Sequence, residues 1–266
     1  MRLLIEAKGP QLPLDYLLVR VRQRRAALRR GESRPFSTEA AWLYHRLPTK
    51  ARLQLDPLFI LAALRPLIIT LRHRFGGDVR GAAATLGDSL LDPALQKILL
   101  QPGEGVTLLR RLEVTLAVEY PWLQGIAEQW RDKGVAGVES QLQGGSLVAG
   151  STSAWRPARR FCIALIDARN LMALAKHFTA ALLNPPRFLV GGEIPLRKLQ
   201  RLWQRHDAAA LLALTGRRAE ADPTPQQLET VLRNRLSTRL QREGTDPLRF
   251  ELILDYLWRC RLQAAE

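Results

Sequence analysis

The chain has 266 residues, of which 47% are hydrophobic and 24% charged, a balance typical of folded globular proteins and not of disordered ones. Its 40 Lys and Arg against 25 Asp and Glu give a formal charge of +15, which favours an anionic partner such as nucleic acid, acidic lipid headgroups or an acidic protein surface. A solvated basic surface without a dedicated partner is the alternative.

The most apolar stretch, residues 58–71, contains Arg65 and Pro66 and is shorter than the roughly 20 residues that a membrane-spanning helix needs. The first residues lack the apolar core of a signal peptide. We therefore expect neither a transmembrane segment nor a signal peptide. Cys162 and Cys260 stand alone in apolar stretches, without a CxxC spacing, which favours free thiols in a reducing, cytoplasmic compartment.

Helix signals dominate the sequence. Leu, Ala and Arg are abundant, and all three have high helix propensity. A capping residue followed by Pro, which suits the first turn of a helix, occurs at Asp56-Pro57, Asp92-Pro93, Thr224-Pro225 and Asp246-Pro247. The sequence therefore predicts an all-α fold.

Apolar spacing predicts the first helix from Leu14 to about Leu28, with arginines on its other face. We expect Ser37 or Thr38 to cap a second helix that runs to about Leu47. A third, over 57–75, should kink at Pro66.

The central part is predicted to hold a short helix through Leu86, another over 93–100, and a long one over 107–133 that breaks near Pro121. Residues 134–153 are rich in Gly and Ser and are predicted to form a linker. The remaining predicted helices cover 157–183, a stretch from Pro195, 208–214, 225–243 and 247–264.

A short internal repeat is also suggested. Leu112-Glu113 and Leu228-Glu229 are each predicted to begin an amphipathic helix, and Asp167 and Asp255 each lie about two turns into the long helix that follows. Such a repeated helix pair indicates modules built on one plan, although a match this short also arises by chance.

No catalytic or cofactor motif is present. The histidines His45, His73, His177 and His206 are scattered, and the chain contains no GxGxxG, no phosphate loop and no GxSxG. We therefore expect a non-catalytic protein without a cofactor, a metal site or a small-molecule substrate.

The densest charge cluster lies in the first helix. Arg20, Arg22, Arg25 and Arg29 are the residues we expect at a partner interface. Cations near a helix C-terminus also complement its dipole without any ligand, which accounts for Arg29, whereas both interpretations stay open for Arg22 and Arg25.

A more specific pattern lies near the middle of the chain, where IDARNLMALAK (166–176) is followed by FLVGGEIP (188–195). This pair resembles the central signature of the C/d family of rotor-coupling subunits in V-type and archaeal-type rotary ATPases. There a long helix carries an acidic residue and an Asn-Leu pair, and a Gly-Gly turn leads into the next helix. The signature residues here are Asp167, Asn170, Leu171, Gly191 and Gly192. The opening LDYLLVRVR (14–22) and the ending ILDYLW (253–258) also resemble that family.

The resemblance implies a funnel of three helical modules with pseudo-threefold symmetry, here 1–106, 107–223 and 224–266, packed as one unit. It implies a peripheral rotor subunit on the cytoplasmic face of the membrane, which caps the rotor ring, receives the central shaft and transmits torque for proton or sodium transport. Its partners would be the ring and shaft subunits, with anionic lipid headgroups as a further contact. Asp167 and Asn170 would be helix-packing polar groups. A basic nucleic-acid-binding protein and an enzyme on a helical scaffold are the rival hypotheses.

Overall fold

The computed structural model describes residues 2–32, 35–87, 89–180, 186–214, 231 and 250–263. Within these ranges the fold is all-α, and the only extended pairing is an isolated bridge between Leu4 and Leu91. The elements are α1 (Leu14–Arg29), α2 (Phe36–Arg46), α3 (Thr49–Gln54), α4 (Asp56–Phe75), α5 (Val79–Leu86), α6 (Pro93–Leu100), α7 (Gly105–Leu116), the 3-10 turn η1 (Pro121–Leu123), α8 (Ile126–Ser151), α9 (Arg156–Ala180), α10 (Leu196–Arg205), α11 (Ala208–Leu214) and α13 (Phe250–Gln263). The helix predicted over 225–243 lies outside the described residues except for residue 231, which is helical.

Local chemistry explains several helix boundaries. Asp92 caps α6 as predicted, because its Oδ1 accepts a hydrogen bond from the Ala94 amide at 2.8 Å. The expected caps at Ser37 or Thr38 are wrong, because α2 begins at Phe36 and places both inside its first turn. The expected cap at Asp56 is also wrong, since Leu55 occupies that position without a side-chain bond.

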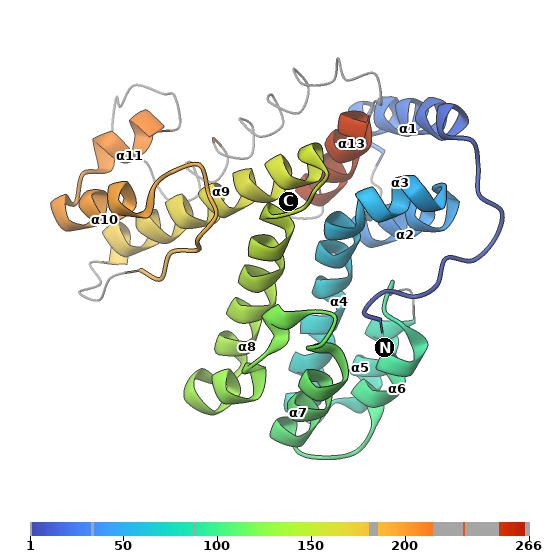
Figure 1. Cartoon of the computed structure of the whole chain (residues 1–266), viewed down its shortest axis with the longest axis horizontal. Coiled ribbons are helices and arrows are strands. Elements are labelled where there is room, and N and C mark those ends of the chain that lie inside the picture. The colour runs from blue at the N-terminus through green and yellow to red at the C-terminus, as the bar shows by residue number, and fades with distance from the viewer. Residues whose placement is uncertain are drawn as a thin grey trace.

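The break predicted near Pro121 is present, but its form differs from the prediction. α7 ends at Leu116, so Leu112-Glu113 lies within that helix and does not begin one. After η1, Gly125 adopts a left-handed conformation at φ +78°, and its amide donates to Glu113 Oε1 at 2.6 Å. This tight connection lets α8 return alongside α7 (Figure 1).

The linker predicted over 134–153 is wrong, because α8 continues through this stretch to Ser151. Within α8 only Gly134, at the start of the stretch, has a non-helical conformation, with φ 60° and ψ −148°, and it kinks the helix there. Gly144, Gly145 and Gly150 lie where Leu189, Trp122 and Cys162 approach the helix, so that an added Cβ would come within 2.8, 2.8 and 2.4 Å of those side chains. The glycines therefore reflect close packing and not a flexible connection.

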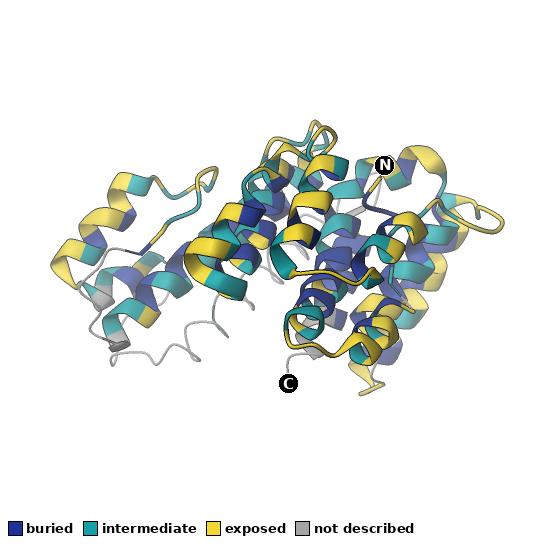
Figure 2. Cartoon of the chain, turned by 90° about the horizontal axis from the view of Figure 1, so that it is seen from below, coloured by how far each residue is buried: buried dark blue, intermediate teal, exposed yellow. Residues whose placement is uncertain are grey.

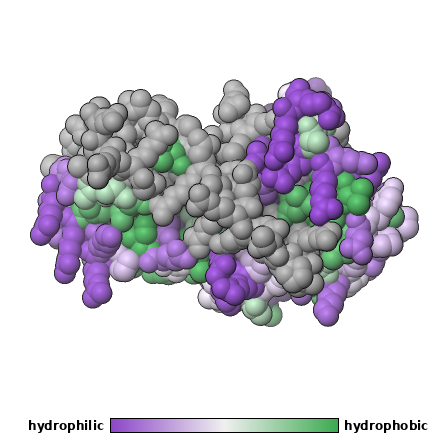
Figure 3. All heavy atoms as spheres, turned by 90° about the horizontal axis from the view of Figure 1, so that it is seen from above, coloured by the Kyte–Doolittle hydropathy of each residue, from purple (hydrophilic) through white to green (hydrophobic). Residues whose placement is uncertain are grey.

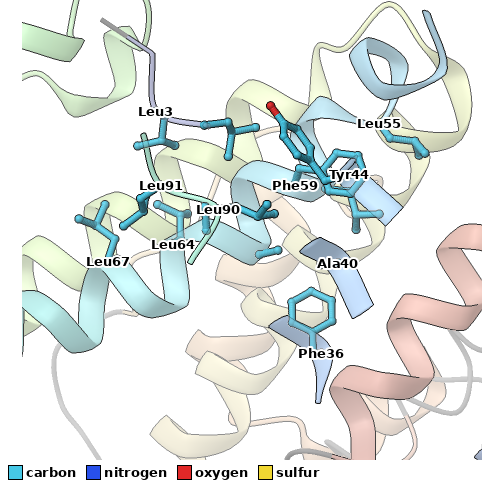
Figure 4. Close-up of a cluster of buried hydrophobic side chains, with 14 of the residues drawn as sticks. Leu3, Phe36, Ala40, Tyr44, Leu55, Phe59, Leu64, Leu67, Leu90 and Leu91 are labelled. Carbon is cyan, nitrogen blue, oxygen red and sulfur yellow. The ribbon is translucent and has the colours of Figure 1, made fainter. Parts of the chain in front are cut away.

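Most of the molecule shares one hydrophobic core. It joins the N-terminal segment, α1 to α8, the start of α9 and α13, and Figure 4 shows part of it around Phe36, Tyr44 and Phe59. The Tyr44 ring packs edge-on against Phe59 at 5.0 Å, and its hydroxyl donates to the Ile5 carbonyl at 2.5 Å. Residues on both sides of the expected boundary at 106 contribute to this single cluster.

A second, smaller cluster lies at the other end of α9. It contains Leu171, Leu174, Ala175, Leu199, Leu202 and Leu211. We call the second half of α9 (169–180), the connection 186–195, α10 and α11 the arm. We call the N-terminal segment, α1 to α8, the start of α9 and α13, which share the larger core, the main body. α9 joins the arm to the main body, and the arm extends away from α4 and α7 (Figures 1 and 2). Every described helix is too short or too polar to cross a bilayer.

Candidate partner interfaces

The α1 arginines do not share one environment. Arg20, Arg22 and Arg29 are exposed, whereas Arg25 is half-buried and forms an ion pair inside the chain. Its Nε lies 2.7 Å from Asp255 Oδ2 in α13. Of the four predicted interface arginines, Arg20, Arg22 and Arg29 are therefore the ones exposed to a partner.

Asp255 is 1% exposed and forms ion pairs with two cations. Besides Arg25, Arg259 Nε lies 3.1 Å from Oδ2, one turn along α13. Burial lowers the pKa of Arg25, and the neighbouring Asp255 opposes that shift. A buried carboxylate held between two guanidinium groups is a structural junction, which fixes α13 against α1.

A second buried junction lies beside the first. Glu39, 3% exposed, accepts from Arg24 and also from the Tyr256 hydroxyl, the latter at 2.5 Å. The Arg24 guanidinium stacks over the Trp42 ring at 3.7 Å. Burial, followed by the bond to Glu39, raises the pKa of Tyr256. Together the two junctions join the first two helices to the last one.

The signature residues come together between α9 and α10. Asn170 is 1% exposed, and its side chain pairs with both backbone polar groups of Leu189: Nδ2 donates to the carbonyl at 2.9 Å, and Oδ1 accepts from the amide at 2.8 Å. One amide side chain thus replaces the two bonds that a neighbouring strand would supply.

Asp167 holds the next part of the same connection. Its Oδ2 accepts from the Glu193 amide and its Oδ1 from the Ile194 amide, both at 3.1 Å. An added Cβ at Gly192 would lie 2.1 Å from Asp167 Oδ1, and Gly191 has φ +91°, so the turn requires both glycines. Leu171, 2% exposed, packs into the arm's apolar cluster. We call Asp167, Asn170, Gly191 and Gly192 the clasp.

Sequence reasoning missed a second basic surface, on α10. Leu199 and Leu202 are buried, whereas Arg197, Lys198, Arg201 and Arg205 are exposed and form no ion pair in the described part of the chain. Figure 3 shows strongly hydrophilic side chains projecting from the end of the molecule that α10 forms. The spacing in LRKLQRLWQR carries this signal, because a helix places its leucines on one face and its cations on the other.

The other reactive side chains that the structure describes do not cluster. Across the described ranges, no three His, Cys, Asp or Glu side chains gather as a metal ion would require. Cys162 is buried, which raises the pKa of its thiol to about 12, and Cys260 is buried and also not in a disulfide. Comparison of the chain with protein-family models, with curated proteins and with solved structures finds no match.

Proposed function

We propose that the chain is a non-catalytic rotor subunit of a V-type or archaeal-type ATPase. In this role it caps the membrane rotor ring, receives the central shaft and transmits torque between ATP chemistry and ion transport. It acts from the cytoplasmic face as a peripheral subunit, and its three modules form the funnel that the resemblance implies.

The clasp is the observation that carries this proposal. The residues that resemble the family signature are separated in sequence, yet the side chains of Asp167 and Asn170 bond to the backbone on both sides of Gly191-Gly192. Such an arrangement fixes the direction in which α10 leaves α9 without the help of a ligand. A subunit that transmits torque requires helices whose relative directions are fixed, which is what the clasp supplies.

Charge gives further support. The exposed cations of α1 and α10 lie at two separate parts of the molecule, so that one chain can present basic surfaces both to an acidic protein partner and to anionic headgroups. The arginines of α1 divide accordingly, with Arg25 used internally and Arg22 and Arg29 left for contact.

The test is affinity purification of the tagged chain from gently solubilised native membranes, followed by identification of the proteins that co-purify. The proposal predicts shaft and ring subunits in fixed ratio. Recovery of the chain without any rotary-ATPase subunit, at low and at physiological salt, contradicts it.

One surface favours the rival function of nucleic-acid binding. The four exposed cations of α10 suit a phosphate backbone, and this function predicts duplex affinity whose logarithm falls linearly with the logarithm of salt concentration. The exposed face of α10 contains no Trp, Tyr or Phe on which bases could stack, since Trp203 is half-buried in the arm. We therefore rank this function second.

A further inference from the structure

An open groove of about 910 Å³ runs between α8, η1 and the connection 186–195. Its floor is one face of α8, from Gly137 through Ser140, Gly144 and Val148 to the C-cap residue Thr152, at helical spacing. At about 1.5 Å of rise per residue this face extends for roughly 20 Å. The groove is therefore elongated, unlike the compact pockets that enclose small molecules.

The walls are apolar and rest directly on the glycines of the floor. Trp122 contacts α8 at Gly145, and Leu189 contacts it at Gly144. Val190, 53% exposed, continues the second wall. The clasp holds this wall in place, because Asn170 fixes both backbone groups of Leu189.

The charges in the groove are of one sign. Lys133 of α8, Arg169 of α9 and Arg187 of the connection all line it, and no Asp or Glu does so among the residues that the structure describes. Lys133 Nζ donates to Gln129 at 3.1 Å and Arg169 donates to Gln143 at 3.1 Å, so both hydrogen bonds are to neutral amides. Burial lowers the pKa of Arg169, since the guanidinium has lost part of its hydration in the wall of the groove.

We propose that this groove docks an acidic amphipathic helix of a partner protein. The exposed floor residues Ala136, Ser140 and Ala149 are small and allow a helix to approach closely. The apolar walls suit its hydrophobic stripe, and the three cations from three elements complement its carboxylates. The length of the α8 face matches a helix of several turns. The groove is distinct from the exposed faces of α1 and α10. The docking proposal does not depend on the proposed rotor role of the chain.

The test uses the full chain and a fluorescein-labelled helical peptide of about 20 residues, long enough to form a helix in water. The peptide carries Leu along one face and Glu on the other, and two counterparts carry Gln or Lys in place of Glu. Fluorescence anisotropy at physiological salt measures the Kd of each. We expect the Glu peptide to bind more tightly than the Gln peptide and the Lys peptide to bind least.

Two variants substitute exposed residues of the groove and leave its buried contacts in place. Lys133→Glu/Arg187→Glu reverses two exposed cations, and Ser140→Trp fills the exposed floor. Each should weaken binding of the Glu peptide by about tenfold or more. The matched control, Arg197→Glu/Arg201→Glu on α10, has the same net charge as the first variant and should bind like the wild type.

Several results would overturn the proposal: no binding of the Glu peptide, equal binding of the three peptides, or equal loss in the groove and α10 variants, which would indicate bulk charge alone. A duplex DNA probe of about 20 base pairs is measured in parallel. If the groove variants lose DNA binding and retain peptide binding, the occupant is nucleic acid and the acidic-helix proposal is wrong.

Discussion

The main body and the arm are stabilised by different interactions. The main body buries a continuous apolar cluster from Leu3 to Cys260 and places two charged junctions inside it. Among its described residues, the arm buries a small cluster of five leucines and Ala175, and it is also held by the clasp, whose Asp167 and Asn170 side chains bond to backbone groups. A small apolar cluster supplies little free energy, so the polar contacts matter relatively more in the arm.

This contrast predicts that the largest single effect lies in the main body. Asp255→Ala leaves Arg25 and Arg259 without their buried carboxylate and should lower the free energy of unfolding by about 3–5 kcal/mol. Urea unfolding followed by circular dichroism measures the change. Asp132→Ala, at an exposed position of α8, is the control and should stay within about 0.5 kcal/mol of the wild type. Equal effects of the two substitutions would contradict the structural role of the junction.

A smaller and local effect is expected in the arm. Asn170→Leu removes both hydrogen bonds to Leu189 and should cost about 2–4 kcal/mol of local stability. Hydrogen–deuterium exchange should show faster exchange in 186–195 and α10, with α4 unchanged. Gln200→Leu on the exposed face of α10 serves as the control. Loss of protection in α4 to the same extent would mean that the two regions unfold together and that the contrast is wrong.

The main body also predicts a dependence on pH. Burial, and then the charge of Glu119, raise the pKa of Asp56 to about 6 from 3.8. Between about pH 4 and pH 6 the folded protein therefore keeps the Asp56 proton, whereas the unfolded chain releases it. Because of this difference, stability declines as pH rises through that range. Asp56→Asn removes this titration. Between pH 4 and pH 7 the variant should therefore gain roughly 1–3 kcal/mol of stability over the wild type. Unfolding curves of both proteins at several pH values provide the measurement, and parallel profiles would refute the assignment.

The smallest effect on stability is expected at the exposed α1 surface. Arg22→Glu/Arg29→Glu should change the free energy of unfolding by about 1 kcal/mol or less, mainly through the dipole of α1, while weakening co-purification with an acidic partner. Arg25→Glu differs, because it places a carboxylate beside buried Asp255 and should destabilise the fold. Thermal melting combined with co-purification at physiological salt separates the two effects. Unchanged co-purification of the double variant would exclude Arg22 and Arg29 from the interface.

The sequence predicted much of this architecture because helix signals are local. Asp92-Pro93 and the spacing of α1 and α10 lie within a few turns of the groups that they act on. The linker prediction over 134–153 failed because Gly145 and Gly150 make room for the side chains of Trp122 and Cys162. These contacts join residues distant in sequence, and no local pattern reveals them.

The candidate sites also include one that a local pattern predicted and others that depend on contacts between residues distant in sequence. A pattern of residues indicated the clasp, but nothing local indicated that Arg25 is paired with Asp255 while Arg22 remains exposed. The groove was not predicted, since it exists only because α8 continues as a helix through 137–151 and the connection 186–195 folds back against it. Long-range pairing is the information that a single sequence carries least directly.

The measurement that tests the proposed coupling role most directly is ATP-driven ion uptake by membrane vesicles from cells that lack the chain. We predict that uptake is lost while ATP hydrolysis continues, and that the wild-type chain restores uptake. Gly192→Ala, which drives a methyl group into Asp167, should restore it poorly. Uptake that proceeds at the normal rate without the chain would contradict the proposed role.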